Sequence, residues 1–246
     1  MSRKPLELKE GAFIVSDAHY SHRREEFLDF IKAIYKKELL PTQLILMGDI
    51  FDALFGGINA TYRANQELIK LLNTISKEIE VIYLEGNHDF NLAKFLPNVH
   101  LFPIKQQPLE ATLYDKRVYL AHGDFDGTTL YKVYSSFIRN SFTLFLLQHI
   151  DNFSNHTILK YVEKHLNKKD DCKRLDGFRE FIRERLHGRF ACDFFIEGHF
   201  HQNCSFGVDD FEYINLAAFA CNQSYFIIKY SNSNTVLVEQ KFSKGK

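Results

Sequence analysis

The sequence predicts an α/β domain with a largely parallel sheet and one helical insertion. Five short apolar runs have the length of buried strands, and helix-spaced apolar residues separate the first three of them. A long segment of different character interrupts this order between the fourth run and the fifth. The chain has 246 residues, 45% hydrophobic and 25% charged, which is typical of a globular protein with a sizeable core. We expect residues 1–246 to form one domain.

The first part of the chain alternates strand and helix patterns. Residues 11–16 (GAFIVS) predict a buried strand, and apolar residues at helix spacing follow over 27–34. A second strand is expected at 43–47, a second helix from about 61 to 77, and a third strand at 81–84. Because parallel strands need long crossover connections, this alternation indicates βαβ units.

The second part contains the remaining strands. A fourth strand is predicted at 117–121 and a fifth at 193–196. Three further β-like runs close the chain, at 212–216, 225–230 and 235–241.

The segment from about 125 to 190 is too long for a simple crossover and reads as mostly helical. It contains twelve Lys or Arg against eight Asp or Glu, so it is net basic although the whole chain has a formal net charge of zero. Residues 131–150 are crowded with aromatic and aliphatic side chains but are too short and too charged to span a bilayer. The insertion is interpreted either as a packed structural element or as a lid that binds substrate.

Hydrophobic runs and cysteine spacing indicate where in the cell the protein is expected. No apolar run reaches the length of a membrane-spanning helix, and the first ten residues lack the apolar core of a signal peptide. Cys172, Cys192, Cys204 and Cys221 have irregular spacing that fits neither a zinc ribbon nor a secreted disulfide framework. We therefore expect free thiols and a cytoplasmic protein.

Metal-binding side chains follow each of the five central strands. Because the carboxyl ends of parallel strands meet at one edge of a sheet, these side chains are expected to form one site. Carboxylate, imidazole and amide oxygen ligands suit divalent ions, and seven are too many for one tetrahedral site but suit two ions with a bridging carboxylate. The seven predicted ligands are Asp17, His19, Asp49, Asn87, His122, His199 and His201.

The order of the motifs is more specific than any motif alone. Each of D-x-H, G-D-x-x-D, G-N-H-D, H-G-D and G-H-x-H occurs by chance, and Gly48 or Gly86 alone suits an ordinary turn. Together, from Asp17 to His201, the series resembles the calcineurin-like metallophosphoesterase superfamily. The resemblance implies a metallophosphoesterase-type β-sandwich flanked by helices (α-β-β-α), which accommodates the three late strands.

The resemblance also implies roles for individual residues. One metal would be held by Asp17, His19, Asp49 and His201, and the other by Asp49, Asn87, His122 and His199. His88 would act as the catalytic residue on the leaving group, with Asp89 tuning it. Asp52 and Asp124 would orient ligands, although simple roles in loops or turns are equally consistent with them. The ions expected are Mn²⁺, with Fe²⁺ and Zn²⁺ as alternatives.

The insertion narrows the subclass. A basic, aromatic, helical insertion between H-G-D and G-H-x-H is similar to that of the UDP-2,3-diacylglucosamine pyrophosphatases of lipid A biosynthesis. The resemblance implies a cap that holds acyl chains, a glycolipid nucleotide substrate, and peripheral contact with the cytoplasmic face of the inner membrane. Phe137, Arg139, Phe142 and Phe145 are the candidate substrate-binding residues, with Leu144 and Leu147 beside them.

One position departs from that subclass. Its best-known members have Arg where this chain has His88, in an otherwise matching G-N-x-D motif. A phosphoesterase acting on a soluble nucleotide or another phosphodiester therefore remains the alternative, with a non-catalytic scaffold more remote. A nucleic-acid substrate is not expected, because the chain outside the insertion is net acidic.

Overall fold

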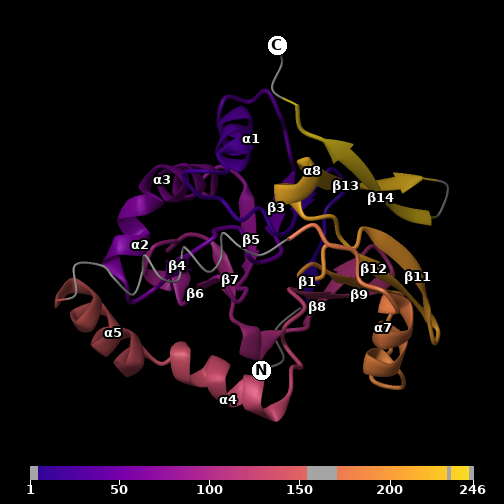
Figure 1. Cartoon of the computed structure of the whole chain (residues 1–246). Coiled ribbons are helices and arrows are strands. Elements are labelled where there is room, and N and C mark those ends of the chain that lie inside the picture. The colour runs from indigo at the N-terminus through magenta and orange to yellow at the C-terminus, as the bar shows by residue number, and fades with distance from the viewer. Residues whose placement is uncertain (1–4, 154–170, 232–233, 244–246) are drawn as a thin grey trace.

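The computed structural model describes residues 5–153, 171–231 and 234–243. Two six-stranded sheets pack face to face, and helices cover their outer faces (Figure 1). This is the helix-flanked β-sandwich that the sequence predicts.

The first sheet has the strand order β14-β13-β2-β3-β5-β7. Strands β2, β3, β5 and β7 are parallel, and β13 pairs with β2 and β14 in antiparallel fashion. The bounds are β2 Phe13–Val15, β3 Gln43–Leu46, β5 Glu80–Leu84, β7 His100–Phe102, β13 Ser224–Ser231 and β14 Asn234–Lys241.

The second sheet has the order β1-β8-β9-β10-β12-β11, in which β9, β10 and β12 are parallel. Its bounds are β1 Leu6–Glu7, β8 Leu109–Leu113, β9 Lys116–Ala121, β10 Phe194–Glu197, β11 Cys204–Val208 and β12 Phe211–Asn215. A separate pair joins β4, Leu54–Phe55, to β6, Asp89–Phe90.

Helices cover the outer faces of the sandwich. The helix α1, Glu26–Tyr35, and α3, Gln66–Ile75, pack on the first sheet, and α7, Phe178–Leu186, packs on the second. The short helices are α2 Asn59–Ala64, α8 Phe219–Asn222, and the 3₁₀ turns η1 Leu92–Lys94 and η2 Ile104–Gln106.

The strand β2 shows why the central strands are apolar throughout. Phe13 and Val15 face the helices α1 and α3, whereas Ile14 points the other way and packs between the two sheets. Side chains alternate along a strand, so a strand covered on both faces needs apolar residues at every position.

The predicted helix over about 61–77 is in fact two helices, α2 and α3, which meet at Asn65. The Asn65 side chain donates to the backbone carbonyls of Ala53, 3.0 Å away, and Thr61, 2.8 Å away. Asparagine competes with helical backbone bonding in this way, so it interrupts an otherwise periodic pattern. The strands β1, β4, β6 and β7 were not predicted, because each has only two or three residues. The strands β8 (LEATL) and β11 (CSFGV) were also not predicted, although their burial alternates along the strand.

The predicted insertion contains α4, Thr129–Ile138, and α5, Ser141–Phe153, which extend away from the sheets (Figure 1). Leu144 of α5 is only 3% exposed and packs against Ile58 and Phe90. We call α4 and α5 the cap. Residues 154–170 of the insertion lie outside the described residues.

The cysteines depart from the expectation of free thiols. Cys172 and Cys221 form a disulfide with a Cα–Cα distance of 5.8 Å, whereas Cys192 and Cys204 are free. Spacing along the chain could not predict this pair, because the fold brings together residues 49 positions apart. Within the described ranges, every helix is too short or too polar to cross a bilayer.

Candidate metal centre

The loops after five strands bring the seven predicted ligands together. Asp17 and His19 follow β2, Asp49 follows β3, Asn87 follows β5, His122 follows β9, and His199 and His201 follow β10. Potential ligand atoms of Asp17, His19 and His201 all lie within 4.8 Å of one another, and so do those of Asp49, His122 and His199. A third such group, His19, Asp52 and His88, shares His19 with the first. The first and last groups each come from one half of the predicted ligand set.

The ring of His122 is oriented by a backbone carbonyl. Its Nδ1 lies 2.9 Å from the carbonyl oxygen of Met47, which can only accept, so Nδ1 carries the hydrogen. The other nitrogen, Nε2, then faces Asp49 Oδ2 and Asn87 Oδ1, each 3.3 Å away. Three potential ligand atoms thus converge, and a proton or a metal cation between them relieves their repulsion.

Two further histidines are held in the same way. Nδ1 of His201 donates to the carbonyl of Asp171, and Nε2 lies 3.0 Å from Asp17 Oδ1. Nδ1 of His88 donates to the carbonyl of Asp52 over 2.9 Å. The sequence could not reveal these carbonyl partners, because every residue has a carbonyl group.

His19 provides a direct test of whether a metal fits. Both of its ring nitrogens are buried and have no hydrogen-bond partner among the described residues. Its Nδ1 is 3.6 Å from Asp52 Oδ1, beyond hydrogen-bond distance. An unsatisfied buried polar group costs about 1–3 kcal/mol, which coordination of a divalent ion would remove. The donor set of carboxylate, imidazole and amide oxygen therefore fits the two ions expected from the sequence.

The pKa shifts of the site residues indicate that the buried carboxylates favour positive charge beside them. Burial opposes ionisation of Asp49, but the neighbouring His122 and His88 rings hold its pKa well below the ordinary value. Burial likewise opposes the charged ring of His201, yet the Asp17 carboxylate raises its pKa to about 9. His199 differs, because burial and the nearby His122 ring lower its pKa to about 4. Protons here occupy the places in which cations would neutralise the two carboxylates.

The backbone at the site is in a costly conformation. Five of the seven ligands have positive φ angles: Asp17 at 52°, His19 at 45°, Asp49 at 51°, His199 at 61° and His201 at 58°. Such residues cost on the order of 1 kcal/mol each and persist where function requires them. Gly86 has a related role, since a Cβ there would lie 2.2 Å from Asp49 Oδ1. This glycine therefore permits close approach to a ligand and is more than a turn residue.

Asp89 has a different position from the one predicted. Its buried carboxylate accepts hydrogen bonds from the backbone N–H groups of Asp49, Ile50, Phe51 and Gly86 and from the Tyr83 hydroxyl. Three of these donors belong to the loop that presents Asp49, and the other two belong to β5 and the loop that presents Asn87. None of them is the ring of His88. These contacts indicate that Asp89 supports the backbone around Asp49, and its predicted influence on His88 stays a prediction.

The other predicted supporting residues lie beside the ligands. Asp52 Oδ1 is 3.6 Å from His19 Nδ1 and 4.0 Å from His88 Nδ1. Asp124 accepts from the Tyr131 hydroxyl over 2.8 Å. Tyr131 was not singled out in the sequence, where nothing distinguishes it from the other aromatic residues of the insertion.

The predicted substrate-binding residues fall into two environments. Phe137, Phe142 and Phe145 are 64%, 68% and 55% exposed on the cap. Arg139, by contrast, is nearly buried at the junction of the cap and the core, where its Nη2 donates to the carbonyl of Gly86 over 3.0 Å. Leu144, which the sequence analysis named beside the candidate substrate-binding residues, contributes to packing between cap and core.

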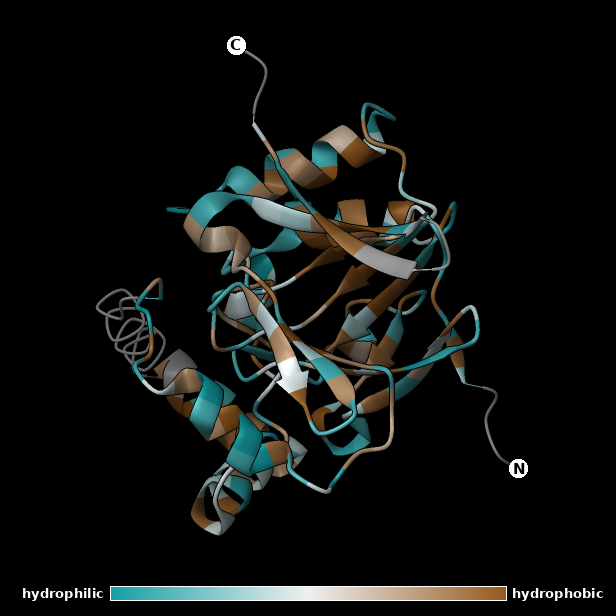
Figure 2. Cartoon of the chain, turned by 90° about the vertical axis from the view of Figure 1, so that its right-hand side faces the viewer, coloured by the Kyte–Doolittle hydropathy of each residue, from teal (hydrophilic) through white to brown (hydrophobic). Residues whose placement is uncertain are grey.

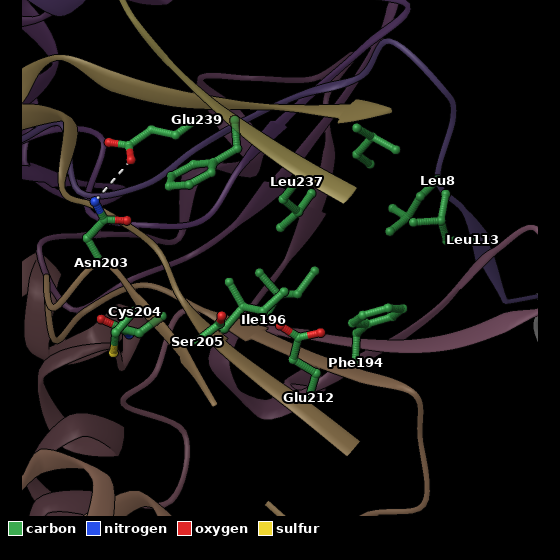
Figure 3. Close-up of a pocket in the computed structure, with 14 residues that line it drawn as sticks. Leu8, Leu113, Phe194, Ile196, Asn203, Cys204, Ser205, Glu212, Leu237 and Glu239 are labelled. Carbon is green, nitrogen blue, oxygen red and sulfur yellow. Dashed lines mark hydrogen bonds between the residues drawn. The ribbon is translucent and has the colours of Figure 1, made fainter. Parts of the chain in front are cut away.

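A separate cavity of about 530 Å³ opens between β10–β12 of the second sheet and β13–β14 of the first (Figure 3). Leu8, Leu113 and Ile196 contribute to its apolar wall, and Asn203 donates to Glu239 at one end. Its lining contains none of the seven predicted ligands. The metal centre is therefore a distinct feature of the molecule.

Comparison with known proteins agrees with this geometry. A model of the family described as calcineurin-like phosphoesterase matches residues 12–203, a range that contains all seven ligands. The chain is 25% identical over 202 residues to the UDP-2,3-diacylglucosamine hydrolase of Histophilus somni (strain 129Pt), covering 77% of this chain and 83% of that one. It is 26% identical over 172 residues to the Pseudomonas aeruginosa (strain UCBPP-PA14) protein of the same name, covering 68% and 70%.

One solved structure is also similar, the phosphoesterase Yfce from E. coli. It has a TM-score of 0.43 at 14% identity, covering 89% of this chain and 87% of that one.

Proposed function

The chain belongs to the calcineurin-like phosphoesterase family, and from this premise we propose that it hydrolyses UDP-2,3-diacylglucosamine to 2,3-diacylglucosamine 1-phosphate and UMP. The observation that carries the proposal is an exposed apolar cap beside a complete metal-ligand set. Distant relatives named UDP-2,3-diacylglucosamine hydrolase support the choice of substrate.

Different residues of the chain have different roles in the proposed hydrolysis. Asp17, His19, Asp49 and His201 would hold one ion, and Asp49, Asn87, His122 and His199 the other, with Asp49 as the bridge. Two bound divalent ions neutralise charge on the phosphoryl group and supply a nucleophilic water at neutral pH. Mn²⁺ is the ion we propose, and Fe²⁺ and Zn²⁺ suit the same ligands.

We propose that His88 acts on the leaving group. Its Nδ1 hydrogen is held by the Asp52 carbonyl, and its Nε2 lies 3.9 Å from Asp49 Oδ2, at the face of the metal centre. A protonated Nε2 can donate to the oxygen that departs from phosphorus, and such general-acid help is worth about 10²–10⁴-fold in rate.

The cap supports the choice of a lipid substrate. Nine of the fifteen large hydrophobic side chains that are exposed in the described residues lie on α4 and α5. Figure 2 shows apolar residues spread along both helices. Monomeric proteins rarely expose so much apolar surface without a binding role. We propose that Phe137, Phe142 and Phe145 contact the acyl chains, and that the cap also rests on the cytoplasmic face of the inner membrane.

The decisive experiment is hydrolysis of UDP-2,3-diacylglucosamine by purified protein with Mn²⁺, beside an Asn87→Ala control and a panel of soluble nucleotides. Metal-dependent release of UMP that is lost in the control is the expected result. Cleavage of soluble nucleotides or simple phosphodiesters alone would indicate a phosphoesterase with a different substrate. This is the alternative that arises because the chain has His88 where the lipid A enzymes have Arg.

The membrane contact has its own test. We expect the protein to float with anionic liposomes at low salt, because the cap exposes apolar side chains and the insertion from about 125 to 190 is net basic. Protein that stays entirely in the soluble fraction would rule out a peripheral location.

A further inference from the structure

We propose that the groove between α4 and the core is a subsite for a phosphorylated sugar, with Arg139 binding the phosphate. The inference rests on the proposed function and identifies the part of the substrate held beside the metals. Both halves of a sugar–nucleotide diphosphate contain a phosphorylated sugar, so the experiment below distinguishes them.

The groove has a volume of about 560 Å³ and two unlike walls. One wall is α4, with Tyr131, Lys132, Ser135 and Arg139. The other wall consists of loops that follow central strands and includes Glu85, Lys105 and Asp124. In Figure 1, α4 lies at the end of the molecule opposite α1. The groove therefore joins the cap to the same strand ends that carry the metal ligands.

Arg139 has unused hydrogen-bonding capacity in this groove. Its side chain is 10% exposed, and its Nη2 donates to Gly86 and lies 3.4 Å from Asp124 Oδ2. The remaining nitrogens, Nε and Nη1, are buried and have no partner among the described residues. Unpaired N–H groups on a buried guanidinium are costly, and phosphate oxygens are strong acceptors for such groups. Stacking on the Phe90 ring, 5.0 Å from the guanidinium carbon, holds the group in place.

The position of Arg139 connects the groove to the metals. Gly86, its acceptor, immediately precedes the ligand Asn87, and Asp124 follows the ligand His122 by two residues. A phosphate bound by Arg139 is thus next to the one that the metals would hold. This is the arrangement that a diphosphate requires, with one phosphorus attacked and the other anchored.

The charges and polar groups of the groove suit the same ligand. Lys105 and Lys132 have no ion pair in the part of the chain that the structure describes, so their charge is available to an anion. Glu85 is already occupied as an acceptor from the Leu92 N–H, 2.8 Å away. Ser135 and Asn140 add a hydroxyl and an amide at the height where sugar hydroxyls would lie.

Isothermal titration calorimetry on Mn²⁺-loaded protein tests the subsite without any turnover. The probes are glucosamine 1-phosphate and UMP, with glucosamine and uridine as phosphate-free counterparts. The variants are Arg139→Gln, Arg139→Lys and, as a matched control, Arg63→Gln, whose side chain is exposed on α2. The metal content of every variant is measured in parallel.

We expect Arg139→Gln to weaken binding of one phosphorylated probe at least tenfold, Arg139→Lys to weaken it less, and Arg63→Gln to leave it unchanged. The probe affected identifies which half of the substrate occupies the groove. Equal affinities in the wild type and Arg139→Gln, no binding of either phosphorylated probe, or a loss explained by a fall in metal content would each overturn the subsite. If the subsite stands while UDP-2,3-diacylglucosamine is not hydrolysed, only the proposed substrate fails.

Discussion

The Nδ1 hydrogen of His122 points at the backbone carbonyl of Met47, 2.9 Å away, and this contact turns the opposite nitrogen toward the centre of the site. His201 and His88 are fixed by carbonyls in the same manner. Three rings are therefore held in one tautomer before any metal binds, and the ligand atoms need little reorganisation. Pre-orientation of this kind makes metal binding and catalysis sensitive to single substitutions.

The bridging position of Asp49 gives the first prediction. Asp49→Asn keeps the size of the side chain but removes the charge that both ligand groups share. The variant is expected to bind at most one Mn²⁺ per chain, against two in the wild type, and to lose activity on the order of a thousandfold. Elemental analysis of protein dialysed against Mn²⁺, together with a phosphodiester assay, measures both. Two ions retained in Asp49→Asn would contradict the bridging role.

His88 is predicted to affect the rate without affecting the metals. His88→Asn should lower kcat by about 10²–10³ while metal content stays at the wild-type level. The loss should be larger for an alkyl leaving group than for p-nitrophenolate, because the poorer leaving group needs the proton more.

His88→Arg is the informative partner substitution at this position. Arg is the residue of the similar lipid A enzymes, and it donates to phosphate without exchanging a proton. We expect it to recover more activity on the diphosphate substrate than His88→Asn does. Equal loss in both variants would show that Arg cannot replace the imidazole ring in this site.

The seven ligands could be predicted because each follows an apolar run that can only be a buried strand. Since strand ends share one edge, residues as distant as Asp17 and His201 were expected together without any knowledge of contacts. The orienting carbonyls of Met47, Asp52 and Asp171 had no such signal. The position of Arg139 was equally invisible, because its contact with Gly86 spans 53 residues and depends on how the cap docks.

Asp89 allows a prediction about stability. Its carboxylate is fully buried and gathers four backbone N–H groups, so Asp89→Asn places an amide N–H₂ against donors. We expect a loss of about 3 kcal/mol in the free energy of unfolding. Tyr83→Phe, which removes one hydrogen bond to the same carboxylate, should cost about 1.5 kcal/mol. Urea denaturation compares the two, and an equal cost would show that the backbone bonds to Asp89 are unimportant.

The cysteines give a chemical prediction. Iodoacetamide should label two of the four in unfolded, unreduced protein and all four after reduction, because Cys172 and Cys221 are paired. In the folded protein Cys192 should react slowly at pH 8, since burial raises its pKa to about 11 and leaves roughly one thiol in a thousand ionised. Its labelling rate should rise about tenfold per pH unit up to that pKa. Four labelled cysteines without reduction would contradict the disulfide.

The cap provides a matched pair of substitutions on one helix. Leu144 is 3% exposed and packs on Ile58 and Phe90, whereas Phe142, two residues earlier, is 68% exposed. Leu144→Ala is therefore expected to destabilise docking of the cap by about 2–4 kcal/mol, which hydrogen exchange in α4 and α5 would report as faster exchange. Phe142→Ala should change stability by no more than about 0.5 kcal/mol.

We expect the same two substitutions to affect substrate binding in the opposite order from their effects on stability. Phe142→Ala is expected to raise KM for a diacylated substrate, because one large ring contributes about 1.5–3 kcal/mol when fully buried against hydrocarbon. KM for a water-soluble phosphodiester should change far less, since that substrate has no chain for the ring to cover. An unchanged KM for the diacylated substrate would place the acyl chains elsewhere and would leave the exposed face of α5 without a role in catalysis.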